Sequence, residues 1–269
     1  MFRKILIATD NSALMDNIIE YTATLFPYSQ YYVINVIDTS SGPVPMTYLL
    51  HETLSKISRE AVDNAKKRLQ DMGIDGVVKM TPQGKPSHEI LSAIRKHEIE
   101  LLVMATHAKS GTQRLHIGKT CRRCLRRVHC PVMIINKPPR PVRPSRILNP
   151  TSGSKYSKGA SELAALLAEH FGAILTNLFI GPEEKMAESF DYVIGGTKSL
   201  GVKLNEMVCD SVPERCIIEE TKKNDLLICS RGRRGVAYKF RIFAHRLALG
   251  KLERDIIAQG EIPLIMVND

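Results

Sequence analysis

The sequence contains no long apolar run. Nowhere do about 18 apolar residues follow one another, so no transmembrane helix is expected. The first apolar stretch, Ile5 to Ala8, is short, and Asp10 interrupts it soon after, which is not the pattern of a secretory signal peptide. These absences predict a cytoplasmic protein with no membrane partner.

Cysteines and aromatic residues are scarce. Six cysteines lie unevenly spaced among 269 residues, which is not the pattern of a disulfide framework, and in the cytoplasm they should be reduced. The spacing of Cys209, Cys216 and Cys229 suggests no pairing between them. Aromatic residues make up 6% of the chain and tryptophan is absent, so no RNA-binding signature with interleaved aromatics is visible.

Common catalytic motifs are also missing. The sequence has no G-x-S-x-G, no H-E-x-x-H and no S-G-G-x-D-S loop of the ATP pyrophosphatases. Gly118-Lys119-Thr120 is similar to the end of a P-loop, but that motif needs glycine at position 113, where this chain has glutamine. The sequence therefore predicts no enzyme, or at most a slow ATPase.

Acidic residues are absent from Leu101 to Ser161. This stretch carries thirteen lysines and arginines, and it accounts for the whole net charge of +10. A basic region of this kind attracts phosphates, nucleic acid or acidic proteins.

Four prolines fall within residues 138–145, where neither a helix nor a strand should continue. We interpret this segment as a linker between two domains, residues 1–137 and 146–269. On both sides short apolar runs alternate with helical patterns, and Glu100 to Met104 matches Asp225 to Cys229. The repeat predicts a duplicated α/β domain with mostly parallel strands and helices on both faces of the sheet.

The expected elements follow from periodicity, turn residues and caps. In the first half we expect strands at 5–8, 32–37, 77–80, 101–104 and 131–135, and helices at 13–25, 47–72, 86–97 and 119–128. In the second half we expect strands at 147–148, 173–180, 203–208, 225–229 and 262–267, and helices ending near 171, at 213–223 and at 251–258.

Two segments resemble the universal stress protein family. Residues 5–12, I-L-I-A-T-D-N-S, are similar to the typical opening I-L-V-A-V-D-G-S, and residues 101–135 are similar to the C-terminal block of the family domain. The resemblance implies two tandem, doubly wound, Rossmann-like sheets of five strands, paired through the last strand of each half as an intramolecular pseudo-dimer. It also implies a regulatory stress-response protein, with a homodimer as a further level of assembly.

ATP-binding members of this family carry an aspartate after the first strand and a loop of the form G-x2-G-x9-G-[S/T]. Here Asp10 is kept, and the loop spacing is kept with alanine in place of both leading glycines. The resemblance implies ATP with magnesium in the first domain. Asp10 would contact the ribose or the metal, Val36 would line the adenine pocket, and the phosphate loop would contain Ala105, His107, Ala108, Gly118, Lys119 and Thr120.

The second domain departs further from this pattern. The position that matches Asp10 is Ser152 or Thr151, and seventeen residues separate Gly232 from Gly250, a longer spacing than the family pattern has. Residues 236–245 have the character of an insertion, so no nucleotide is expected here.

Residues 119–128 allow two further hypotheses. Cys121 and Cys124 form a C-x-x-C pair, but they also fall on an apolar helical stripe, which favours buried free cysteines over a zinc site. The other side of the helix carries Arg122, Arg123, Arg126 and Arg127. These arginines are either a solvated face or a surface that binds nucleic acid or an acidic protein, with the fold as a scaffold only.

Overall fold

The structure is a computed structural model that describes residues 1–40, 47–106, 117–140, 142–153, 156–181, 200–209, 212–231 and 251–268. Its first half contains β1 (Lys4–Ala8), α1 (Ala13–Leu25), β2 (Gln30–Ile34), β3 (Ile37–Asp38), α2 (Tyr48–Asp71), β4 (Val78–Met80), β5 (Gln83–Gly84), α3 (Pro86–His97), β6 (Leu101–Ala105), α4 (Lys119–Leu125) and β7 (Val132–Ile135). Its second half contains β8 (Arg146–Thr151), α5 (Lys158–Phe171), β9 (Ile174–Phe179), β10 (Leu204–Val208), α7 (Pro213–Thr221), β11 (Leu226–Ser230), α8 (Lys251–Gln259) and β12 (Leu264–Val267).

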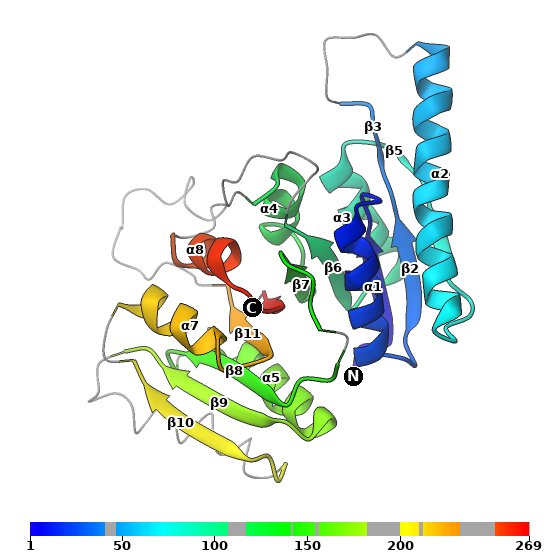
Figure 1. Cartoon of the computed structure of the whole chain (residues 1–269). Helices are drawn as coiled ribbons and strands as arrows, with labels where there is room; N and C mark the ends of the chain where they lie inside the picture. Colours follow the sequence, from blue (N-terminus) through cyan, green and yellow to red (C-terminus); the bar gives the residue numbers. More distant parts are fainter. Residues whose placement is uncertain are drawn as a thin grey trace.

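Ten strands form one continuous sheet, in the order β10-β9-β8-β11-β12-β7-β6-β1-β2-β4 (Figure 1). Within each half all neighbouring strands are parallel, and only the pair β7–β12, where the halves meet, is antiparallel. The short strands β3 and β5 form a separate parallel pair. The two expected five-stranded sheets are therefore confirmed, and they join edge to edge as the internal pseudo-dimer.

Helices cover both faces of this sheet, as a doubly wound fold requires. Side chains of β1 alternate, so that Ile5 and Ile7 pack in one core cluster and Leu6 packs in the other. The first cluster receives buried side chains from α1, α2 and α5, and the second receives them from α3, α4, α7 and α8. Both clusters contain residues of both halves, so each core continues across the junction.

Several helix bounds follow directly from local sequence signals. Helix α3 begins with Pro86, whose fixed φ suits the first turn, and it ends at His97, after which Glu98 adopts a left-handed φ of 55°. Helix α2 begins after Thr47, whose side chain accepts a hydrogen bond from the backbone N–H of Leu50. Helix α1 spans the expected residues 13–25.

Three expected elements end three residues away from the predicted position, and the other differences are of one or two residues. Strand β2 ends at Ile34 rather than Ile37, because the chain turns at Asn35. The side-chain amide of Asn35 donates a hydrogen bond to the Thr9 carbonyl. Helix α4 ends at Leu125 rather than at residue 128. Strand β8 continues from Arg146 to Thr151, three residues past the expected end at Leu148. Its pairing with β11 stops at Leu148, so the missing N–H of Pro150 lies beyond that ladder.

The segment between the halves contains no helix or strand among its described residues, which are 136–140 and 142–145. Strand β7 ends at Ile135 and β8 begins at Arg146, so the proposed linker 138–145 falls inside this segment. No helix in the described part of the chain is long and apolar enough to cross a membrane.

Candidate functional site

The candidate site lies at the carboxyl ends of β2, β1 and β6. The chain runs outward from β1 to β2 and β4, and it then returns to the other side of β1 to form β6. This reversal makes the boundary between β1 and β6 the topological switch point, where parallel α/β sheets bind their ligands. In register Ala8 pairs with both Ile34 and Met104, so Asp10, Val36 and Thr106 each lie two residues beyond the same level of the sheet.

Asp10 lies in a tight turn between β1 and α1. Its Oδ1 accepts a hydrogen bond from the backbone N–H of Ser12 at 3.0 Å, and Thr9 Oγ1 accepts one from Asn11 at 3.1 Å. Asn11 has a φ of +59°, and asparagine tolerates this left-handed conformation better than most residues. The turn holds the half-buried Asp10 carboxylate at the strand edge.

The second half repeats this turn. Thr151 Oγ1 accepts a hydrogen bond from the backbone N–H of Gly153 at 3.1 Å, and Gly153 has a φ of +65°. Thr151 and Gly153 thus correspond to Thr9 and Asn11, and the residue between them, Ser152, corresponds to Asp10. The carboxylate of the first half is replaced by a hydroxyl in the second.

Val36 is half-buried beside the second core cluster, directly after the turn at Asn35. Asn35 fixes this turn with three hydrogen bonds: its N–H donates to the Met80 carbonyl, its amide donates to Thr9, and its carbonyl accepts from Ser58 Oγ. The sequence interpretation missed Asn35, although an asparagine that follows a buried strand is a common sign of a structured turn.

Gly118 connects the start of α4 to the end of β6. Its N–H donates to the carbonyl of the buried Thr106 at 2.7 Å, and a Cβ at this position would lie only 3.0 Å from the same oxygen. Close backbone approach therefore favours glycine at position 118, whereas its φ of −53° is open to any residue. Lys119 is exposed and Thr120 is half-buried at the start of α4.

Ala105 occupies the first altered glycine position of the loop. It is the last residue of β6 and has no positive φ, so the methyl group causes no backbone strain here. His107, Ala108 and His116 lie outside the described residues, as do Gly232, Gly250 and the apparent insertion between them.

The structure thus places Asp10, Val36, Ala105 and Gly118 at one edge of the sheet, with Lys119 and Thr120 following directly. Ser12 Oγ is buried near this edge and has no hydrogen-bond partner among the described residues. A cavity of about 540 Å³ lies elsewhere, in the second half under α7.

The cysteines of residues 121–130 are buried and free, as expected. Burial raises the pKa of Cys124 to about 12 and that of Cys130 to about 11, and it raises the pKa of Cys121 still further. Protonated thiols are poor metal ligands. No group of three potential metal-ligating side chains occurs among the described residues.

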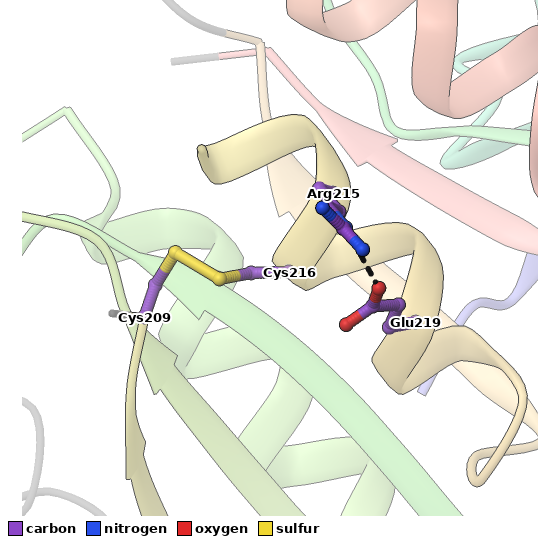
Figure 2. The surroundings of a disulfide bond; sticks show 4 residues. All are labelled: Cys209, Arg215, Cys216 and Glu219. Atoms are coloured by element: carbon purple, nitrogen blue, oxygen red, sulfur yellow. Dashed lines mark hydrogen bonds and ion pairs between the residues drawn. A yellow bond between two sulfur atoms is a disulfide. The ribbon is translucent and has the colours of Figure 1, made fainter. Parts of the chain in front are cut away.

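The expectation that all cysteines are reduced was wrong for one pair. Cys209, directly after β10, forms a disulfide with Cys216 on α7, with Cα atoms 5.9 Å apart (Figure 2). The two positions are seven residues apart and meet only because α7 folds back over the edge of the sheet. Spacing in the sequence alone carries no signal of this contact.

The outer side of α4 and the residues after it form a basic face, which consists of Lys119, Arg122, Arg123, Arg126 and Arg127. None of the ion pairs between described residues includes any of these five side chains. The Nε of Arg126 is buried without a described partner. Arg231 of the second half adds a further cation, since its guanidinium donates to the Leu125 carbonyl at 2.7 Å.

Comparison with known proteins gives consistent matches. Residues 1–136 match the model of the Universal stress protein family. Universal stress protein MJ0531 of Methanocaldococcus jannaschii is 28% identical over 144 residues, which cover 51% of this chain and 84% of that protein.

Two solved structures share the whole fold. A universal stress protein from Archaeoglobus fulgidus has a TM-score of 0.78 and 18% identity, covering 98% of this chain and 96% of its own. A putative universal stress protein from Pseudomonas aeruginosa has a TM-score of 0.66 and 14% identity, covering 99% and 93%. The arrangement of two joined halves is therefore an established fold.

Proposed function

The chain belongs to the universal stress protein family, and on this premise we propose that it is a regulatory stress-response protein whose first half binds ATP or a related adenine nucleotide. One observation carries the proposal. Asp10, Val36 and the start of α4 meet at the switch-point edge of the first half, where a parallel α/β sheet holds its ligand.

The local chemistry of this edge fits a nucleotide. One carboxylate oxygen of Asp10 accepts the hydrogen bond from the Ser12 N–H. The other oxygen would accept a hydrogen bond from a ribose hydroxyl or contact a magnesium ion. Magnesium commonly takes one or two protein carboxylates together with phosphate oxygens, so a single aspartate is sufficient. Val36 offers an apolar contact to a base, and Lys119 and Thr120 offer a charge and a hydroxyl to phosphates. His107 and Ala108 would complete the loop.

The second half has lost the corresponding carboxylate, because Ser152 stands in the place of Asp10. We therefore expect one nucleotide per chain. No catalytic step is assigned to the site, and a purified sample tested for ATP hydrolysis should show slow turnover at most.

The first test is the nucleotide content and affinity of the purified chain. Any bound ligand is released by heat and identified by mass, and ATP with magnesium is then titrated by calorimetry. We expect one site of micromolar affinity, which corresponds to about −8 kcal/mol. Asp10→Asn, which keeps an oxygen for the Ser12 N–H, should weaken binding at least tenfold.

Asp75→Asn is the matched control, because Asp75 is exposed in the turn before β4, at the amino edge of the sheet. It should leave the affinity unchanged. Unchanged affinity in Asp10→Asn would remove the assignment of Asp10. If the wild-type chain neither carries nor binds a nucleotide, the first half has kept the fold and lost the ligand.

A second candidate function is binding of an acidic macromolecule, with nucleic acid as the first case to test. The observation that favours it is the basic face, whose five cations make no ion pair with the described residues. Unpaired cations on one surface attract phosphates without regard to base sequence.

A further inference from the structure

The disulfide between Cys209 and Cys216, called here the α7–β10 disulfide, joins two exposed parts of the second half. Among the described strands, β10 lies at one edge of the ten-stranded sheet and pairs with β9. Helix α7 covers the neighbouring face, and Cys216 is its fourth residue. Figure 2 shows the bond running from the end of the strand to the underside of the helix.

Helix α7 has few other apolar anchors. Its buried side chains are Cys216, Ile217, Glu220 and Thr221, of which only the first two are apolar. Arg215 and Glu219 pair with each other on the outer side of the helix, at 3.0 Å (Figure 2). The disulfide thus anchors one of the two buried apolar side chains of this nine-residue helix.

The short separation of the two cysteines limits what the bond does for global stability. A disulfide that closes a short loop restrains the unfolded chain less than one that closes a long loop. Its main effect is local, since it fixes the start of α7 relative to the end of β10.

The sulfur atoms are placed for exchange with an external thiol. Cys209 is half-buried rather than buried, so an attacking thiolate has access to the bond. Cys121, Cys124 and Cys130 are buried in the first half with raised pKa values, so they do not compete as internal nucleophiles. After cleavage, a thiolate of Cys216 would lie in the first turn of α7, where the helix dipole favours negative charge.

We propose that Cys209 and Cys216 are a reversible redox couple that controls the attachment of α7 to β10. In the reducing direction a dithiol breaks the S–S bond and supplies two electrons and two protons. The protein gains two thiols, and the dithiol closes to its own disulfide. In the oxidising direction a small disulfide accepts the two electrons and leaves as two thiols. The expected location, the cytoplasm, is one where protein disulfides are usually transient or redox-sensing.

The couple also controls the cavity of about 540 Å³ beside it. The strand side of this cavity is lined by Ile174 and Thr176 of β9 and by Asn205 and Met207 of β10, and its helix side by Glu220 and Asn224. The disulfide joins the same strand and the same helix that form the two sides. Release of α7 therefore changes the width of the cavity.

The test combines thiol counting with hydrogen exchange on the full chain. Alkylation after denaturation should modify four cysteines in protein treated with a small disulfide and six in protein treated with a dithiol under native conditions. Reduction should accelerate amide exchange in β10 and α7 at least tenfold and leave β1 and α1 unchanged. The double variant Cys209→Ser/Cys216→Ser should exchange like the reduced protein, with or without dithiol.

Four results would overturn the proposal. Six alkylated cysteines after mild oxidation would mean that the bond does not form. Four after native dithiol treatment would mean that it is a permanent structural bond. Equal exchange of β10 and α7 in both redox states would mean that the bond does not control α7. If dithiol alters exchange in the double serine variant, the response belongs to other cysteines.

Discussion

At the scale of single residues, charged side chains hold the amino end of β1. The Glu100 carboxylate accepts hydrogen bonds from the Arg3 backbone N–H at 2.6 Å and from the Arg3 guanidinium at 3.2 Å. Burial by itself raises the pKa of Glu100, but these bonds and the charge of Arg3 outweigh it and hold the pKa below its usual value. Two residues away, Glu98 pairs with Lys4 as an exposed ion pair.

This pKa shift predicts how stability depends on pH. A carboxylate with a lowered pKa in the folded state contributes stability above its unfolded pKa and loses it as the pH falls through the folded value. We expect Glu100→Gln to lower the free energy of unfolding at pH 7 by about 1 kcal/mol or less. Between about pH 5 and pH 3 the stability of this variant should fall less steeply than that of the wild type.

Urea unfolding at several pH values measures both effects. Glu98→Gln is the control, because its exposed carboxylate should contribute little at any pH. If the free energy of unfolding of Glu100→Gln and that of the wild type change with pH in parallel, Glu100 is not the cause of the pH dependence.

At the scale of elements, the basic face of α4 makes a prediction of its own. We expect binding of duplex DNA to weaken steeply as the salt concentration rises. A plot of the logarithm of the association constant against the logarithm of the salt concentration should have a slope of about −0.9 for each phosphate neutralised. Arg122→Glu/Arg127→Glu reverses two exposed cations and should weaken binding at least tenfold at low salt, measured by fluorescence anisotropy.

The control Lys56→Glu/Lys67→Glu makes the same change in net charge on exposed positions of α2. Equal weakening in both double variants would mean that net charge, and not the basic face, attracts DNA. Affinity that does not change between low and physiological salt would remove the second candidate function.

Elements with local signals were predictable, and elements set by distant contacts were not. Helices α1 and α3 have the expected bounds, because residues at their own ends determine where they begin. The end of β2 depends on the contact between Asn35 and Thr9, and the length of β8 depends on its pairing with β9. The α7–β10 disulfide depends on the path of α7 across the sheet, and so the sequence showed no sign of it.

The candidate site was predictable to the same degree. The sequence indicated Asp10 and Gly118 because residue type and spacing survive in the family pattern. It did not show that Asn11 takes a left-handed conformation where the family typically has glycine. Nor did it decide between Ser152 and Thr151 as the counterpart of Asp10, whereas the matching turns at Thr9 and Thr151 identify Ser152.

At the scale of the whole molecule, the junction between the halves is built from backbone and side chains alike. Val132–Ile134 of β7 pairs with Leu264–Met266 of β12, and the rings of Phe26 and Phe171, one from each half, lie 6.3 Å apart. The side-chain amide of Asn136 donates hydrogen bonds to the Ile257 and Gly260 carbonyls, and that of Asn268 donates one to the Cys130 carbonyl. Each half therefore donates side-chain hydrogen bonds to the backbone of the other.

The shared cores predict that both halves unfold together. A tryptophan introduced at Tyr28 reports on the first half and one at Tyr156 on the second, since the chain has no tryptophan of its own. Urea transitions at the two probes should coincide. Ile265→Ala, at a fully buried junction position, should lower the stability seen by both probes by about 2–5 kcal/mol.

Ile57→Ala removes the same atoms from an exposed position of α2 and should change stability by about 0.5 kcal/mol or less. Two separated transitions, or a loss confined to the Tyr156 probe, would show that the halves are independent.

The antiparallel pair β7–β12 has a consequence for how such a molecule diverges. In an assembly of two identical chains, a substitution changes both copies of a site at once, and pairing weakens on dilution. Here the partner strands belong to one chain, so the effective concentration of one half for the other is set by the tether and not by expression level. One half is then free to change a residue at the sheet edge, as Ser152 in the place of Asp10 illustrates, and to acquire a cross-link of its own. The two copies can specialise while the pairing that stabilises them persists.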